Sequence, residues 1–159
     1  MYTAEASVEV KADQNKVWEF VSNYQNFSQF MPNIERIELL EGDISQWHLS
    51  GPLGIPVSWQ AMTSIKQAPN HLAWHSLKGT IETKGFIKLE PSPAGSKITV
   101  HMEYIPPLGL IGEAFAKIFK DPQKMLEDGV AKLAGLFNGN DVVVKDKAQT
   151  RASDASRQM

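Results

Sequence analysis

Apolar and polar residues alternate strictly at the start of the chain. One side of the alternation carries Tyr2, Ala4, Ala6, Val8 and Val10, and the other carries Thr3, Glu5, Ser7 and Glu9. A period of two is typical of a β-strand with one buried face. We therefore predict a strand over residues 2–10.

A helical pattern replaces this alternation after Asp13, a residue that suits a helix N-cap. The apolar positions at helical spacing are Val17, Phe20, Val21 and Tyr24. A second short helical turn is predicted before Pro32, because proline disfavours helical backbone in the residue that precedes it. Its apolar cluster consists of Phe27, Phe30 and Met31.

From residue 34 to residue 104 the pattern is almost entirely that of short strands. The predicted strands cover approximately residues 34–41, 44–50, 56–66, 71–78, 82–90 and 96–104. Turn signals rich in Gly, Pro, Asn and Asp separate them. Because the connections are short, we expect each strand to pair with its sequence neighbour in an antiparallel meander.

The period changes to that of a helix after Pro107. Apolar residues form one stripe at Leu108, Ile111, Phe115, Ile118, Phe119, Met125, Leu126, Val130, Leu133, Leu136 and Phe137. Pro122 interrupts the pattern, but proline is well tolerated at the first helical position, with Asp121 as the N-cap. We predict a long helix that is kinked or broken at Asp121-Pro122 and ends near Gly139.

Residues 140–159 differ from the rest, because they are polar apart from one valine run and contain no aromatic side chain. We therefore divide the chain into a single folded domain over residues 1–139 and a flexible polar tail over residues 140–159.

The elements predict an α+β fold in the order strand, two short helices, six strands and one long helix. An antiparallel sheet of seven strands twists and curls. The C-terminal helix is the element long and amphipathic enough to fill its concave face. Because one helix seldom fills such a surface, we expect an apolar cavity of roughly a few hundred Å³ between sheet and helix.

A set of short motifs in the sequence resembles a known family. They are Val17-Trp18, Phe30-Met31-Pro32, Gly51-Pro52-Leu53-Gly54, Trp59-Gln60-Ala61, Trp74-His75-Ser76, Gly85-Phe86-Ile87 and Tyr104-Ile105-Pro106-Pro107. With the order of elements over residues 3–138, they resemble the START-like (SRPBCC) superfamily, in particular its polyketide cyclase/dehydrase-like and coenzyme Q-binding branches. The resemblance implies the helix-grip fold, a curved seven-stranded sheet wrapped around a long C-terminal helix.

Members of this superfamily bind lipids, quinones, polyketides or hormones, or act on them as enzymes. The resemblance therefore implies a hydrophobic small-molecule ligand: a lipid, an isoprenoid quinone or a polyketide-like compound. It assigns no catalytic residue, because catalytic residues differ between the branches.

Composition narrows the chemistry further. The chain has no cysteine, which excludes disulfides, thiolate catalysis and Cys-ligated metals. Its 16 Lys and Arg against 18 Asp and Glu give a net charge of −2, so we expect no nucleic-acid partner. No signal-peptide pattern or membrane-spanning apolar run occurs, which predicts a cytoplasmic protein without an integral membrane segment. Transient contact with a membrane or a protein is left open.

The histidines predict neither a metal site nor a catalytic dyad. On a strand, the spacing of His71 and His75 separates them by roughly 13 Å, too far for one metal ion. His101 and Glu103 share a strand face, but apolar residues alternate with them, so we expect both to face solvent. We therefore predict no metal, no cofactor and no catalytic residue.

The inward strand faces and the helical stripe supply the predicted ligand-binding residues. They are Trp47, Trp59, Ala61, Thr63, Trp74, Ser76, Gly85, Ile87, Val100, Met102, Tyr104, Leu108, Ile111, Phe115 and Phe119. Small residues at Ala61 and Gly85 leave room among large aromatic side chains, and methionines adapt to irregular apolar molecules. The candidates to orient one carbonyl or hydroxyl group of the ligand are Thr63, Ser76, Thr83 and Tyr104.

Two alternatives to ligand carriage stay open. One is a cyclase or dehydratase acting on a polyketide-like substrate, which needs an acid or base inside the cavity; the candidates are Tyr104, His48 and, if its ambiguous strand faces inward, His75. The other is a protein-interaction module. The loops over residues 51–56 and 105–109 combine Pro, Gly and apolar residues, so they are candidate gates of the cavity.

Overall fold

The computed structural model shows one antiparallel sheet with helices on its concave side. The elements are β1 (Tyr2–Val10), α1 (Gln14–Val21), the 3-10 helix η1 (Tyr24–Gln29), β2 (Ile34–Leu39), β3 (Ile44–Ser50), β4 (Pro56–Gln67), β5 (His71–Ser76), β6 (Glu82–Ser92), β7 (Gly95–Ile105), α2 (Gly109–Ile118), α3 (Pro122–Asn138) and β8 (Val143–Asp146). The structure describes residues 1–31, 33–51, 54–77, 81–105, 108–138 and 143–146.

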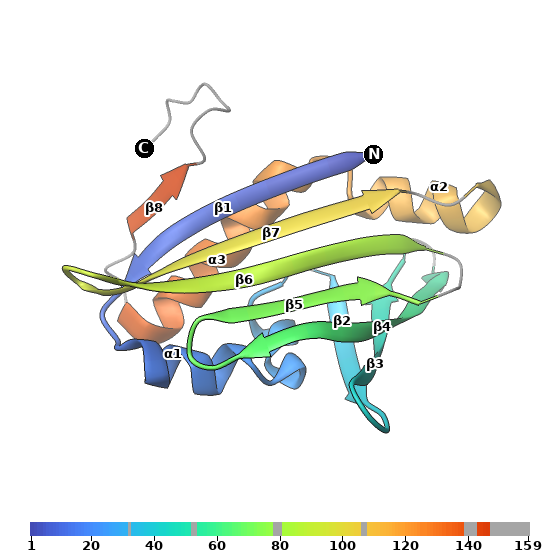
Figure 1. The fold of residues 1–159 in the computed structure, drawn as a ribbon. Helices are drawn as coiled ribbons and strands as arrows, with labels where there is room; N and C mark the ends of the chain where they lie inside the picture. Colours follow the sequence, from blue (N-terminus) through green and yellow to red (C-terminus); the bar gives the residue numbers. More distant parts are fainter. Residues whose placement is uncertain (32, 52–53, 78–80, 106–107, 139–142, 147–159) are drawn as a thin grey trace.

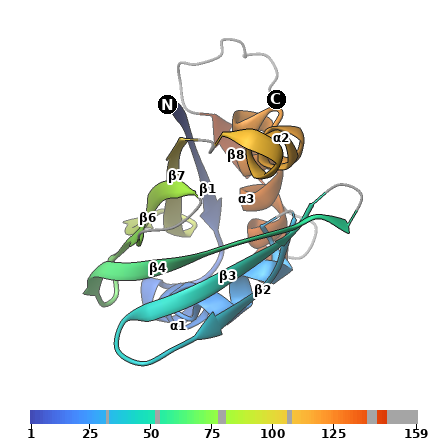
Figure 2. The same cartoon turned by 90° about the vertical axis from the view of Figure 1, so that its right-hand side faces the viewer.

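The sheet curls around α3. Its strands lie in the order β2-β3-β4-β5-β6-β7-β1-β8, so the first strand pairs with the last long strand. Figure 1 views the sheet with α3 behind it, and Figure 2 shows the strands from β2 to β4 and those from β6 to β1 on two sides of the helix. This is the α+β helix-grip architecture that the sequence predicted.

The pairing of β1 with β7 brings the two ends of the domain together. Ala4 lies opposite Met102 and Ala6 opposite Val100. Every second residue of β1 from Ala4 onward is buried, as its alternation predicted. The boundaries of all seven predicted strands agree with the structure within two residues, because a strand with one buried face records its register in its hydrophobic pattern.

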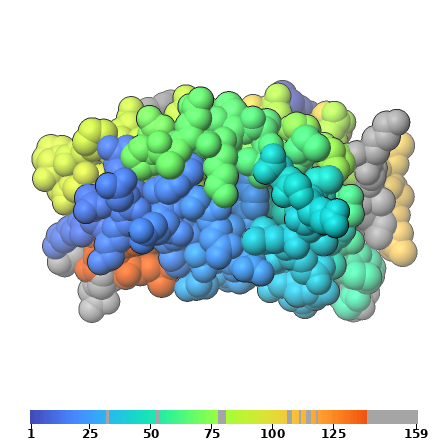
Figure 3. Space-filling model, turned by 60° about the horizontal axis from the view of Figure 1, so that its bottom comes forward, coloured from blue at the N-terminus to red at the C-terminus, as the bar shows by residue number. Residues whose placement is uncertain are grey.

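The first helix begins as predicted and ends earlier. Asp13 Oδ1 accepts a hydrogen bond of 2.9 Å from the N–H of Lys16. The predicted helix extends to Tyr24, whereas α1 ends three residues before it. Asn23 explains the difference, because its side chain accepts a 3.0 Å hydrogen bond from the Gln25 N–H and starts η1 instead. In the space-filling view, α1 and η1 form one continuous surface with the neighbouring strands (Figure 3).

The C-terminal helix is broken where the sequence predicted. Helix α3 begins at Pro122, and Asp121 caps it: Oδ1 accepts a 3.1 Å hydrogen bond from the Lys124 N–H, and the Asp121 carbonyl accepts one of 3.0 Å from Met125. Proline fits because the first helical N–H has no partner within the helix. The break lets α2 extend beyond the end of β7 (Figure 1).

An eighth strand, which the sequence analysis did not predict, joins the sheet. Strand β8 pairs antiparallel with β1, from Ala6 opposite Asp146 to Glu9 opposite Val143. Adjacent valines favour extended backbone, but a run this short inside a polar segment does not show an alternating pattern. The remaining residues of the predicted tail, 140–142 and 147–159, lie outside the described part of the chain.

Candidate ligand-binding site

Aromatic side chains from β3, β4, β5 and η1 fill the middle of the concave face. The ring centroids of Trp47 and Trp74 are 5.7 Å apart, and those of Trp47 and Trp59 are also 5.7 Å apart. Tyr24 and Phe27 from η1 pack with their rings 5.8 Å and 5.6 Å from Trp74. All five side chains are buried. The structure thus brings the three predicted tryptophans together and adds two aromatic residues from η1.

The structure determines which way β5 faces. Leu72 and Trp74 are buried, whereas His75 is exposed. Trp74 therefore points inward with the other tryptophans, and His75 points outward.

Three of the four side chains nominated to orient a ligand, those of Thr63, Ser76 and Tyr104, form hydrogen bonds within the protein. The hydrogen bonds join Tyr24 Oη to Thr63 Oγ1 at 2.8 Å, the Thr83 N–H to Ser76 Oγ at 2.9 Å and Tyr104 Oη to the Phe119 carbonyl at 3.1 Å. Burial raises the pKa of both Tyr24 and Tyr104 to about 12. These groups therefore connect elements of the protein, and both phenols stay protonated at neutral pH.

A small apolar cavity lies between the sheet and the C-terminal helices. Its volume is about 30 Å³. Its lining consists of Ala4, Met31, Met102, Tyr104, Phe119, Pro122, Met125 and Leu126. The cavity is at the predicted place but is smaller than the predicted few hundred Å³, because η1 contributes aromatic side chains to the same concave face.

Sequence reasoning selected only part of this lining. Met102, Tyr104 and Phe119 were predicted, whereas Met31, Met125 and Leu126 were missed. Two features of the sequence could have indicated them: Met31 belongs to the apolar cluster before Pro32, and Met125 and Leu126 continue the helical stripe after the break at Asp121-Pro122. Three of the eight lining residues are methionines, whose flexible side chains can be displaced.

Gly85 lies on β6 between the tryptophan cluster and the cavity. A Cβ atom at this position would stand 2.7 Å from Trp74 Cζ2, 2.7 Å from the His101 carbonyl oxygen and 3.1 Å from Met102 Sδ. Any side chain there would displace its neighbours. The sequence predicted that Gly85 leaves room for a ligand, whereas in the structure Trp74 and Met102 occupy that space.

The remaining predicted residues differ in their placement. Ala61, Ile87 and Val100 are buried in the core. Leu108 is 97% exposed, because it precedes the helix that extends beyond the sheet, so it does not line this cavity. The side chains of Ile111 and Phe115, and parts of both candidate gate loops (residues 52–53 and 106–107), lie outside the described part of the structure.

A second hollow, which sequence reasoning missed, opens at the ends of β5, β6 and β7. Its volume is about 260 Å³. It is lined by Met1, His75, Ser76, Glu82, Thr83, Lys84, Glu103, Tyr104 and Ile105. Tyr104 borders both this outer hollow and the inner cavity. Because several strand ends form it, no single stretch of sequence indicates it.

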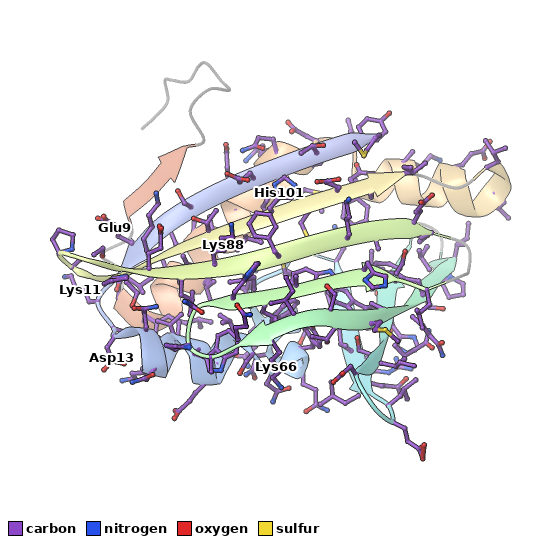
Figure 4. The ribbon with its side chains drawn as sticks, in the orientation of Figure 1. Glu9, Lys11, Asp13, Lys66, Lys88 and His101 are labelled. Atoms are coloured by element: carbon purple, nitrogen blue, oxygen red, sulfur yellow. The ribbon has the colours of Figure 1, made fainter. Side chains whose placement is uncertain are left out.

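A charged cluster lies on the outer face of the sheet. The two ring nitrogens of His101 lie 2.8 Å from carboxylate oxygens of Glu5 and Glu103, and its ring stacks on Phe86. Figure 4 shows His101 and Lys88 on the side of the sheet away from α3. The hydrogen bond with His101 holds the pKa of Glu103 below its ordinary value. The outward facing of His101 and Glu103 is confirmed, while the contribution of Glu5 was not predicted.

The other two imidazoles that a catalytic reading needed also lie outside the cavity. His48 Nε2 is 2.8 Å from Glu38 Oε1 on the outer face of β3, and His75 is exposed. Within the described residues, no group of three or more His, Asp or Glu side chains is arranged to hold a metal ion.

The family model for polyketide cyclases, dehydrases and lipid transport proteins matches residues 1–137 of the chain. The chain belongs to this polyketide cyclase/dehydrase and lipid transport family. No curated protein sequence matches it. Among the described helices of this family member, none is both long and apolar enough to cross a membrane.

Solved structures share the fold of this family member. DR_A0006 from Deinococcus radiodurans is 20% identical with a TM-score of 0.70, covering 86% of this chain and 98% of its own. TTHA0849 from Thermus thermophilus is 17% identical with a TM-score of 0.66, covering 84% and 94%. The di-domain ARO/CYC protein BexL from the BE-7585A biosynthetic pathway is 20% identical with a TM-score of 0.59, covering 84% of this chain and 45% of its own.

Proposed function

We propose that this protein binds a hydrophobic small molecule between its sheet and its C-terminal helices and carries or presents it. The observation that carries the proposal is the apolar cavity beside α3, whose lining includes methionines from β7, from α3 and from the loop between η1 and β2. Methionine side chains rearrange around irregular apolar molecules. Membership in a family described by lipid transport and polyketide chemistry supports the same ligand class.

The proposed ligand is a lipid, an isoprenoid quinone or a polyketide-like compound, carried in the cytoplasm. Such a molecule exceeds the 30 Å³ of the cavity, so its binding requires the methionines of the lining to move. The driving force is burial of apolar surface, about 25 cal/mol per Å².

A cyclase or dehydratase reaction at this site has less support. His48 and His75 face away from the cavity. Tyr104 reaches the cavity, but its hydroxyl donates to the Phe119 carbonyl and its pKa is about 12. A phenol held in this way is a poor proton donor or acceptor at neutral pH.

The test is to extract the purified protein with organic solvent and to compare it with the intact protein by native mass spectrometry. We expect an apolar compound in stoichiometric amount. Met102→Trp fills the cavity and should strongly reduce the bound compound. Met62→Trp is the matched control, because Met62 is exposed on β4. Circular dichroism confirms that both variants fold. Wild-type protein without any bound compound contradicts the proposal.

A further inference from the structure

The indole N–H of Trp74 is a buried donor without an acceptor among the described residues. Trp74 is 2% exposed, and no described group accepts a hydrogen bond from its Nε1. Trp47, in the same cluster, donates its own Nε1–H to Ser45 Oγ at 2.9 Å. Buried polar groups in folded proteins almost always have a partner, because leaving one unpaired costs free energy. Trp74 is therefore an exception that needs an explanation.

The position of this donor points to the ligand site. Trp74 Cζ2 neighbours the ring carbon that bears Nε1, so both atoms belong to one edge of the indole. A Cβ on Gly85 would lie 2.7 Å from Cζ2 and 3.1 Å from Met102 Sδ. Met102 in turn lines the apolar cavity. Met102 thus lines the cavity, and its Sδ and this edge of the indole lie close to the same point above Gly85.

We infer that the Trp74 indole N–H is the polar contact of the ligand-binding site, and that the ligand is a neutral apolar molecule with an acceptor oxygen such as a carbonyl. This inference rests on the proposed function. Indole donates and does not accept, so the ligand group must be an acceptor. The carbonyl enters by displacing Met102, whose unbranched side chain has several rotamers.

The chemistry of the lining selects a neutral ligand. The eight lining residues carry no charged side chain. A carboxylate buried there would lack a cation to compensate it, and burying an unpaired charge is far more costly than burying a carbonyl that accepts a hydrogen bond. Ketones, quinones and esters satisfy this requirement, whereas free fatty acids do not.

Two probes that differ at one ring position test the inference: 1-indanone has a ketone there, and indane has a methylene group. Both are titrated into ¹⁵N-labelled protein, and the indole resonances are followed by NMR. We expect both to bind, and only 1-indanone to move the Trp74 indole proton downfield, as a new hydrogen bond requires. Trp74→Phe assigns that resonance.

Two variants measure how much the Trp74 hydrogen bond contributes to the preference for 1-indanone over indane. In Trp74→Phe the preference for 1-indanone over indane should fall about tenfold relative to the wild type. Trp47→Phe is the matched control, because its N–H already has a partner, and should leave the preference unchanged.

The outcomes separate the two proposals. If both probes bind but the wild-type Trp74 resonance does not respond to the ketone, or the preference survives in Trp74→Phe, the inference is wrong and the proposed function stands. If neither probe binds to the wild type, the proposed function fails and the inference fails with it. Should Trp74→Phe not fold, through-space contacts between the indole proton and its neighbours assign the Trp74 resonance in the wild type, and its response to the ketone still decides.

Discussion

At Gly85 a single methyl group reaches three neighbours at once. An added Cβ would lie 2.7 Å from a backbone carbonyl and 2.7 Å from the Trp74 ring, and neither can move cheaply. Overpacking of a core site typically costs about 1–3 kcal/mol. We expect Gly85→Ala to lower the free energy of unfolding by about this amount, measured by urea denaturation.

Gly135→Ala is the control for this substitution. Gly135 lies in α3 with no atom within 4 Å of an added Cβ, so helix propensity alone should raise the free energy of unfolding by up to about 1 kcal/mol. If Gly85→Ala were as stable as the wild type, Trp74 and Met102 would have more freedom than their packing indicates.

At this scale the sequence predicts residue types better than their partners. The alternation of β6 and β7 indicates that Gly85 and Met102 face inward, because a strand face is a local property. Whether the N–H of Trp47 or that of Trp74 finds an acceptor depends on what neighbouring elements place beside it. Ser45, two residues before Trp47, happens to reach its indole, and no pattern in the sequence marks this difference.

At the scale of elements, periodicity predicted nearly all of the fold. It succeeded where one face of a strand or helix is buried and the other is solvated. It was ambiguous for β5, where Leu72 and Leu77 stand at opposite parity, and pairing with β4 and β6 made the choice. It missed β8, because a strand of four residues has too few positions to show a period.

Side chains at both ends of helix α3 form hydrogen bonds with the backbone of β1 and of the residue that follows it. Gln123 at its start accepts a 3.1 Å hydrogen bond from the Glu5 N–H and donates one of 2.8 Å to the Glu5 carbonyl. Asn138 at its end accepts from the Lys11 N–H at 2.6 Å. The start of α3 therefore fixes both the sheet edge and one wall of the cavity, to which Pro122 contributes.

The cap of α3 should consequently matter for ligand retention as well as for stability. Replacing Asp121 by alanine removes the acceptor for the Lys124 N–H and should lower the free energy of unfolding by about 1 kcal/mol. Because Phe119 and Pro122 flank this cap and line the cavity, we also expect less bound compound in native mass spectra.

Asp13→Ala is the matched control, because Asp13 caps α1 through the equivalent bond to Lys16. It should destabilise the protein by a similar amount and leave ligand retention unchanged. Equal loss of ligand in both variants would show that retention follows global stability rather than the helix break.

At the scale of the whole molecule, the volume of the cavity was the property least accessible to prediction. The cavity volume is the small difference between two larger volumes: that of the space enclosed by the curled sheet and that of the side chains that fill this space. The sequence identified Phe27 as apolar but did not show that η1 would bring it within 5.6 Å of Trp74, on the concave face. The tryptophans predicted to contact a ligand therefore pack largely against one another and against η1.

The edges of the sheet are the other property of the whole molecule. Strand β8 covers β1 from Ala6 to Glu9 on the side away from β7. An uncovered edge presents unpaired N–H and C=O groups that pair with other chains.

We expect a chain that ends at residue 139 to self-associate in a concentration-dependent manner, measured by sedimentation velocity, and to melt at a lower temperature. A chain that ends at residue 146 keeps β8 and, if the polar tail proposed for the C-terminus makes no structural contribution, should behave as the full chain does. Identical sedimentation of all three chains would show that β8 does not protect this edge.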